Sequence, residues 1–143
     1  MSEELIVVIV ILFAFPVFFG GLWFAIMGFV SLGGWRSLAQ AYPMQSSTHA
    51  NWKGLSTVHL EGFLNLGAYR NSVSVGRDET YLHLKPLFFF KPMHPQISIP
   101  LDEVTGDVTA TDMLGKVRLH TEKCKVPIRV SPELARWILG HTG

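Results

Sequence analysis

The sequence predicts an α+β protein in which a transmembrane helix precedes a small, mainly antiparallel β domain closed by a C-terminal helix. Three observations predict this fold. No charged side chain occurs from Leu5 to Leu32, short runs after Gly54 alternate apolar with polar residues, and a helix signal begins at Ser131. With 143 residues, the chain has room for one ordinary domain and an appendage.

The uncharged run from Leu5 to Leu32 is long enough for one transmembrane helix and too short for two. A hydrocarbon core about 30 Å thick needs about 20 apolar residues in a helix. A cleaved signal peptide is the main alternative, but it begins with a basic region and has a shorter apolar core. Here the run follows Met-Ser-Glu-Glu. We therefore expect residues 1–32 to form a membrane anchor.

The distribution of Lys and Arg predicts the orientation of this anchor. None precedes it, whereas Arg36 follows it directly and Lys53 lies farther on. By the positive-inside rule, the N-terminus lies outside and the C-terminal domain lies in the cytoplasm, at the inner membrane. Cys124 is the only cysteine, which excludes an internal disulfide and fits a reducing compartment.

Small residues inside the span indicate a second helix as a partner. They recur near one helical face, so another helix could approach closely there, from a membrane protein or from a second copy of the chain. The alternative is that Gly and Ala are simply common in transmembrane helices. Pro16 lacks an N–H and predicts a kink. The helix-packing candidates are Ala14, Gly21, Ala25 and Gly28.

Residues 33–53 are expected to form a juxtamembrane helix and a polar linker before a β domain over residues 54–143. Apolar residues recur at helical spacing from Trp35 to Tyr42, and Pro43 ends the pattern. Trp and Tyr suit the headgroup region of a bilayer, so Trp35 and Tyr42 are candidates for lipid contact. The alternative is that the same face packs on the domain.

Runs of alternating apolar and polar residues predict about seven strands. Residues 72–75 and 80–84 alternate on either side of a polar turn, so two antiparallel strands joined by a tight turn are expected. The other expected elements are a first strand or hairpin within 56–67 and extended runs at 96–99, 104–110, 115–120 and 125–130.

The C-terminal helix carries signals at both of its ends. Ser131 is a typical N-cap, Pro132 suits the first helical position, and Gly140 suits the end. Its apolar stripe, at spacing i, i+3 and i+4, consists of Leu134, Trp137 and Ile138. We expect this stripe to pack on the sheet.

Three segments resemble those of bacterial single-span membrane proteins of uncharacterised function, which pair one N-terminal span with a pleckstrin-homology-like cytoplasmic domain. They are Gly34-Trp35-Arg36-x-Leu38-Ala39-x-x-Tyr42-Pro43, His94-Pro95-x-Ile97-x-Ile99-Pro100 and Val126-Pro127-Ile128-Arg129-Val130-Ser131. About seven strands followed by one helix is also the order of a pleckstrin-homology-like domain. The chain departs from the pattern at Leu101, where an aromatic residue is expected. The resemblance implies the fold but no activity.

The six histidines do not predict a metal site. None stands in an HExxH motif or at zinc spacing from the single cysteine. His83 and His120 are expected on strands, at the surface or half-buried, and His94 is expected to stabilise a turn.

Other side chains give no sign of catalysis. Asp78-Glu79 and Asp102-Glu103 are adjacent pairs, and neighbours in a strand point to opposite faces. Two flanking lysines could activate Cys124, but a buried structural thiol is the expected state. We therefore expect no enzyme, metal or cofactor, and the net charge of +1 gives no indication of nucleic-acid binding.

A Phe-rich segment is the one surface feature that suggests binding. Three consecutive phenylalanines cannot all face one side of a strand, so either one protrudes or all are covered by other parts of the chain. In a domain tethered at a bilayer, protruding rings and lysines could contact lipid. The lipid-contact candidates here are Lys85, Phe88, Phe89, Phe90 and Lys91.

The expected function is that of a membrane-tethered, non-enzymatic interaction module or accessory subunit at the inner face of the membrane. Its expected partners are the lipid bilayer and a membrane protein or a second copy. The alternative is a domain that senses a lipid or small ligand through the Phe-rich segment. Phosphoinositide recognition is disfavoured, because residues 56–67 contain no Lys or Arg.

Overall fold

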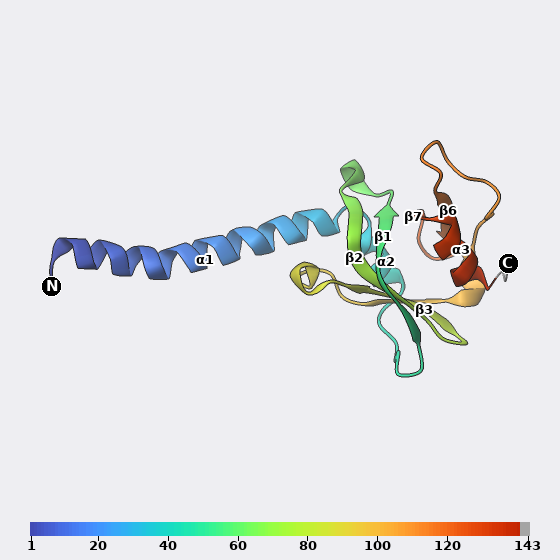
Figure 1. The fold of residues 1–143 in the computed structure, drawn as a ribbon, viewed down its shortest axis with the longest axis horizontal. Helices are drawn as coiled ribbons and strands as arrows, with labels where there is room; N and C mark the ends of the chain where they lie inside the picture. Colours follow the sequence, from blue (N-terminus) through green and yellow to red (C-terminus); the bar gives the residue numbers. More distant parts are fainter. Residues whose placement is uncertain (141–143) are drawn as a thin grey trace.

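A long N-terminal helix leads directly into a nearly closed, seven-stranded antiparallel barrel (Figure 1). The computed structural model describes residues 1–140. Helix α1 (Glu3–Ser31) is followed by the short helix α2 (Trp35–Ala41), and α3 (Pro132–Leu139) ends the domain. The predicted fold class is confirmed.

Helix α1 runs without interruption through Pro16. Ser2 caps its start, where the Ser2 hydroxyl accepts a hydrogen bond from the Leu5 backbone N–H at 3.3 Å, and Glu3 and Glu4 lie in its first turn. By length and composition, α1 could span a membrane or serve as a signal sequence, and no other helix among residues 1–140 could do so.

The seven strands form one sheet in the order β4-β3-β2-β1-β7-β6-β5, and all neighbours are antiparallel. Strand β1 pairs with β2 along its length and with β7 only at its end, where Leu60 lies opposite Ile128. Two irregularities in the β1–β2 register, between Lys53 and Leu55 and between Ser56 and Val58, favour the bending of the sheet. The strands are β1 (Asn51–Leu60), β2 (Gly67–Arg77), β3 (Tyr81–Pro86), β4 (Ile97–Pro100), β5 (Val104–Thr105), β6 (Val117–Thr121) and β7 (Ile128–Val130).

Three short 3-10 turns interrupt the strand connections: η1 (Phe63–Asn65), η2 (Phe88–Phe90) and η3 (Leu101–Glu103). Turn η1 replaces the second half of the first hairpin expected from the sequence, because Leu64 adopts a φ of 53° that extended backbone does not allow. The extended run expected to reach residue 110 stops at Thr105, and Asp107 forms a turn by accepting a hydrogen bond from the Thr109 N–H at 2.9 Å.

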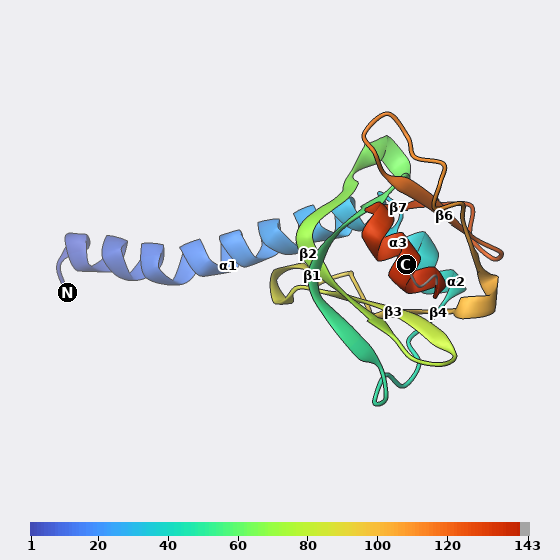
Figure 2. The ribbon, with the colours of Figure 1, turned by 45° about the vertical axis from the view of Figure 1, so that its right-hand side comes forward.

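Both short helices lie within the ring of strands as seen in Figure 2. Helix α3 follows the sequence prediction: the Ser131 hydroxyl accepts a hydrogen bond from the Leu134 N–H at 3.2 Å, and Gly140 ends the helix with a φ of 75°. The residues Leu134, Ala135 and Ile138 are buried in the barrel core. Helix α2 contributes Trp35 and Leu38 to the same core.

Candidate functional site

The junction between α1 and the barrel is a close backbone contact that leaves no room for side chains. A Cβ atom on Gly62 would lie 2.2 Å from the Gly33 carbonyl oxygen, and one on Gly67 would lie 2.6 Å from that atom. Gly34 adopts a φ of 131°, which residues with a side chain rarely adopt. These glycines hold the end of α1 directly against the ends of β1 and β2, without a flexible linker.

Helix α2 continues this junction into the core, and it corrects one expectation from the sequence. Trp35 and Tyr42 were candidates for lipid contact, but they are 0% and 2% exposed and belong to the barrel core. The Tyr42 hydroxyl donates to Glu103 at 3.2 Å and accepts from the Lys123 backbone N–H at 2.8 Å. The apolar face of α2 therefore packs in the barrel core and not on lipid. The barrel also supplies hydrogen-bond partners for the buried Tyr42 hydroxyl.

A buried aromatic cluster holds the chain after η2 against the barrel. The Trp35 indole N–H donates to the Pro95 carbonyl at 2.7 Å, and the rings of Trp35 and Tyr69 pack edge to face at 5.2 Å. The rings of Phe90 and Tyr69 pack in the same way at 5.7 Å. Phe90 therefore turns inward and fixes the base of the loop.

His94 completes this cluster in a neutral form. Its Nδ1 lies 2.8 Å from the Pro92 carbonyl, which can only accept, so Nδ1 carries the hydrogen. Its Nε2 then accepts from the Tyr69 hydroxyl at 2.8 Å. Burial lowers the pKa of His94, although the bond to Pro92 opposes this, and burial also raises the pKa of Tyr69. The expected turn-stabilising role of His94 is confirmed.

The other two phenylalanines of η2 protrude from the barrel. Phe88 is 71% exposed and Phe89 is 61% exposed. The segment is a 3-10 turn and not a strand, so one ring points inward while two point out. Exposure of two adjacent large aromatic rings on a fixed turn is typical of a contact surface.

Turn η2 lies directly beside the C-terminal part of α1. The Trp23 indole N–H donates to the Phe89 carbonyl at 3.2 Å. Between the helix and the turn lies a mostly apolar groove of about 490 Å³, and its lining includes Phe24, Phe88 and Lys91. The protruding rings therefore stand next to the apolar surface of α1.

Two lysines flank the exposed rings. Lys85 and Lys91 both have exposed side chains. Among the ion pairs of residues 1–140, neither lysine takes part in one. Both charges are available to an anionic partner.

The small residues of α1 separate into two groups. Ala14, Gly21 and Ala25 are exposed, and a Cβ added to Gly21 would meet nothing within 4 Å. Gly28 instead faces its own domain, because a Cβ there would lie 3.7 Å from the Met93 side chain. Three of the four helix-packing candidates thus remain open to a partner, and Gly28 does not.

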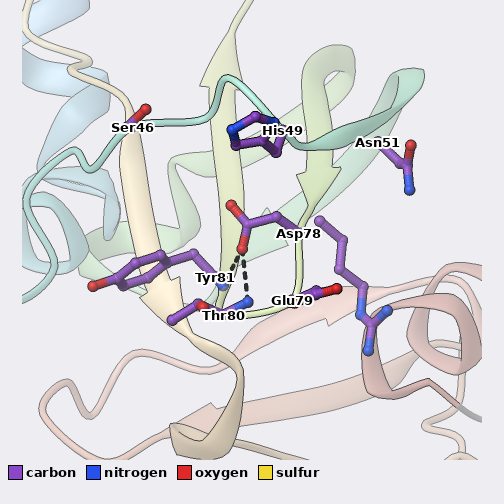
Figure 3. A pocket seen from close by; sticks show the side chains of 8 residues that line it. Ser46, His49, Asn51, Asp78, Glu79, Thr80 and Tyr81 are labelled. Carbon is purple, nitrogen blue, oxygen red and sulfur yellow. Dashed lines mark hydrogen bonds between the residues drawn. The ribbon is translucent and has the colours of Figure 1, made fainter.

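A polar hollow of about 710 Å³ lies beside the β2–β3 turn, on another part of the barrel (Figure 3). Asp78 points into the turn, where one carboxylate oxygen accepts from the backbone N–H groups of Thr80 at 2.8 Å and Tyr81 at 2.6 Å. Arg77 donates to the Ile138 carbonyl at 3.1 Å. Two of the charged groups of the hollow are therefore already bonded within the barrel.

The second oxygen of Asp78 accepts a hydrogen bond from His83, which is fully buried. The Nε2–Oδ2 distance is 2.9 Å, and the other ring nitrogen of His83 lies 2.8 Å from the Ser98 hydroxyl. Burial opposes ionisation of Asp78, but hydrogen bonds from His83 and the turn outweigh it and hold the pKa of Asp78 below its usual value. His83 is thus a core residue and not a surface one, because these two partners satisfy its ring.

Residues 1–140 contain no cluster of three His, Cys, Asp or Glu side chains that could hold a metal ion. Cys124 is half-buried against the core, and His120 is exposed. His141 lies outside the described residues. The described side chains therefore give no specific indication of metal or nucleophilic chemistry.

Residues of η1 and Trp23 belong to the same surface as η2, and the sequence reasoning missed them. Phe63 is 54% and Leu64 is 67% exposed, and the Phe63 ring packs edge to face on Phe29 of α1 at 6.5 Å. The glycine at position 62 is typical of a turn, but the apolar residues Phe63, Leu64 and Leu66 that follow it suggested a strand or hairpin instead.

No protein-family model, curated protein or solved structure matches the chain.

Proposed function

We propose that the protein is a single-pass membrane protein whose barrel acts as a non-enzymatic interaction module or accessory subunit at the inner face of the membrane. Arg36, the only charged residue close to the span on its C-terminal side, favours a cytoplasmic barrel by the positive-inside rule. The partner expected for such a module is a membrane protein or a second copy of the chain.

The observation that carries this proposal is the close backbone junction between α1 and the barrel. A domain that only needs to stay near a membrane can be held by a flexible linker. Here Gly33 contacts the backbone of Gly62 and Gly67, and Trp35, two residues later, is already in the core. A junction of this kind keeps one orientation of the barrel relative to the span, which favours presentation of a fixed surface to a neighbour in the membrane.

The open face of α1 supports a partner within the bilayer. Around Gly21 and Ala25 another helix could approach closely, because these side chains are small and lie away from the domain. Packing there would place the partner beside the span, while the barrel contacts it outside the bilayer.

The test is gentle solubilisation of the full-length protein from native membranes, followed by identification of the proteins that accompany it. We expect a stoichiometric membrane-protein partner or a homo-oligomer. The variant Gly21→Leu should weaken this association at least tenfold, because the larger side chain separates the two helices.

Gly20→Leu is the matched control. A Cβ at Gly20 also meets nothing within 4 Å, but adjacent residues point about 100° apart around a helix, so this variant leaves the open face unchanged. Recovery of the wild-type protein as a lone monomer, or equal loss of association in both variants, would contradict the proposal.

Lipid or small-ligand sensing is a second candidate function, and the exposure of Phe88 and Phe89 beside α1 favours it. A sensing domain should bind its ligand without a protein partner. Full-length protein that is recovered alone, but whose thermal stability depends on the lipid composition of the nanodisc, would support this second function over the first.

A further inference from the structure

We propose that the barrel docks on the leaflet in which α1 ends, through two turns that flank the helix: η2 with Phe88 and Phe89, and η1 with Phe63 and Leu64. The occupant of this surface is an anionic phospholipid bilayer. The inference rests on the proposed membrane anchorage by α1, and it adds a second contact, between the folded domain and the lipid.

The length of α1 places the bilayer boundary near Trp23. About 20 residues at a rise of 1.5 Å cross a hydrocarbon core about 30 Å thick, and counted from Leu5, the first residue after the acidic pair, they end near Phe24. Trp is enriched at this boundary. The apolar turns beyond it are the ones that pack on the domain, where Met27 is 3% and Ser31 is 2% exposed.

Turn η2 lies at the depth of this boundary. The Phe89 carbonyl accepts a hydrogen bond from Trp23, so Phe88 and Phe89 stand beside the last turns of α1 that the bilayer covers. Water would surround two large apolar rings at this place if the barrel stood clear of the bilayer. The cluster around His94 holds the turn in position, so insertion costs little conformational entropy.

Turn η1 contacts α1 farther from the bilayer centre. Phe63 packs on Phe29, and Phe29 lies six residues, or about 9 Å, beyond Trp23 along the helix. Headgroups extend roughly 5–8 Å beyond each side of the hydrocarbon core, so Phe63 and Leu64 lie at headgroup depth or at its outer edge. The surface therefore has a deep contact at η2 and a shallow one at η1.

The charges of the barrel are arranged for an anionic surface on the same side. Residues 62–77 and 80–101, which include both turns, contain no Asp or Glu but include Arg70, Lys85 and Lys91 with exposed side chains. Glu61, which directly precedes η1, is already paired with Arg118 and Arg129. Four of the eleven acidic residues lie in the β2–β3 turn and η3. These two segments lie on the side of the barrel away from α1 (Figures 1 and 2), so lipid phosphates would meet cations and few carboxylates.

The experiment measures the depth of single spin labels on the full-length protein in nanodiscs of pure lipid, with and without anionic phospholipid. Labels are attached at Phe88→Cys, Leu64→Cys and Met113→Cys in a Cys124→Ser background, and collisions with oxygen are compared with collisions with a water-soluble nickel complex. Met113 is the matched control: it is fully exposed and apolar, but lies in the β5–β6 connection and in neither of the two turns. A label at Phe13→Cys reports whether α1 itself spans the bilayer.

The proposal predicts that oxygen collisions dominate at position 88, that position 64 is intermediate, and that nickel collisions dominate at position 113. Replacing the anionic lipid with a zwitterionic one should move the label at position 88 toward water. A position 88 as accessible to nickel as position 113 overturns docking, and a water-like position 64 overturns the two-turn arrangement. If the label at position 13 collides mainly with oxygen in those cases, α1 spans the bilayer, so docking is wrong while the membrane anchorage stands. The nanodiscs contain no protein partner, so this experiment does not test the proposed interaction function.

Discussion

The two ends of the barrel are each held by a buried histidine, but the two histidines have different partners. His94 lies at the end that faces α1, between the Tyr69 hydroxyl and the Pro92 carbonyl, and all three groups are uncharged. Burial lowers the pKa of His94, so this end keeps a neutral ring at neutral pH.

At the far end, His83 bonds an ionised carboxylate. Its partner Asp78 also accepts from two backbone N–H groups of the β2–β3 turn, and these bonds together hold the pKa of Asp78 below its usual value despite its partial burial. One end of the barrel is therefore fixed by uncharged groups beside an apolar helix, and the other by a largely buried carboxylate and the groups that donate to it. The same residue type serves both ends because its two ring nitrogens can bond either kind of partner.

The largest effect is expected from removing α2, which joins the end facing α1 to the core. A fragment that begins at Met44 lacks Trp35, Leu38 and Tyr42, whose burial together contributes about 10 kcal/mol, comparable to the total stability of a domain. We expect this fragment to be unfolded by circular dichroism and by proton chemical-shift dispersion. A fragment that begins at Ser31 should fold, and cooperative thermal unfolding of the shorter fragment would contradict this role of α2.

A single substitution in each helix compares α2 with α3. Trp35→Ala should lower the free energy of unfolding by about 3–5 kcal/mol, because it removes a fully buried ring and leaves the Pro95 carbonyl without its donor. Trp137→Ala should cost less than half as much, since Trp137 is only half-buried at the edge of the core. Denaturant titrations of both variants in mild detergent check the ratio, and equal costs would show that α2 is no more central than α3.

At the far end, Asp78→Asn should lower the free energy of unfolding by about 1–3 kcal/mol at pH 7, because it removes a charged acceptor of three hydrogen bonds. The pKa of Asp78 is lower in the folded state, so its contribution is complete above about pH 4 and is lost as the pH falls through the folded-state pKa. Thermal unfolding between pH 5 and pH 2 should therefore depend less on pH in the variant. An unchanged pH profile would exclude this role of Asp78.

At the end facing α1, we expect His94 to have the smallest effect on the free energy of unfolding, in a pH range above that of Asp78. The pKa of His94 is lower in the folded state, so its contribution is complete above about pH 6.5 and decreases as the pH falls below that value. The wild-type protein should thus lose stability from pH 7 to pH 5, and His94→Gln, which can still accept from Tyr69, should lose less. His59, whose pKa is also lowered by burial and by Arg129, is the control, and His59→Gln separates its contribution.

An element could be predicted from the sequence when the residues that determine it lie close together along the chain. The cap, first residue and end of α3 all lie within ten residues, and the helix has the predicted bounds to within a residue. Helix α2 was also predicted, but not what covers its apolar face. That depends on a bond from Trp35 to Pro95, 60 residues away, which periodicity cannot indicate.

The Phe-rich segment shows the same limit for the candidate site. The sequence indicated that the three rings could not share one side of a strand, and it left open which of them protrude. The structure forms a 3-10 turn in which Phe90 packs on Tyr69 and the other two are exposed. The contribution of η1 was missed because residues 63–66 alternate like a strand, and the contact of Phe63 with Phe29 is formed only in the folded chain.

A distance measured between α1 and the barrel tests whether the two form one rigid unit. Spin labels at Val17→Cys in α1 and Met113→Cys in the β5–β6 connection, in a Cys124→Ser background, report this distance by double electron–electron resonance in nanodiscs. The rigid junction predicts one narrow distance distribution, and insertion of a flexible Gly-Ser segment after Gly33 should broaden it. A broad distribution in the protein without the insertion would contradict the claim, because the barrel would then move freely on its tether.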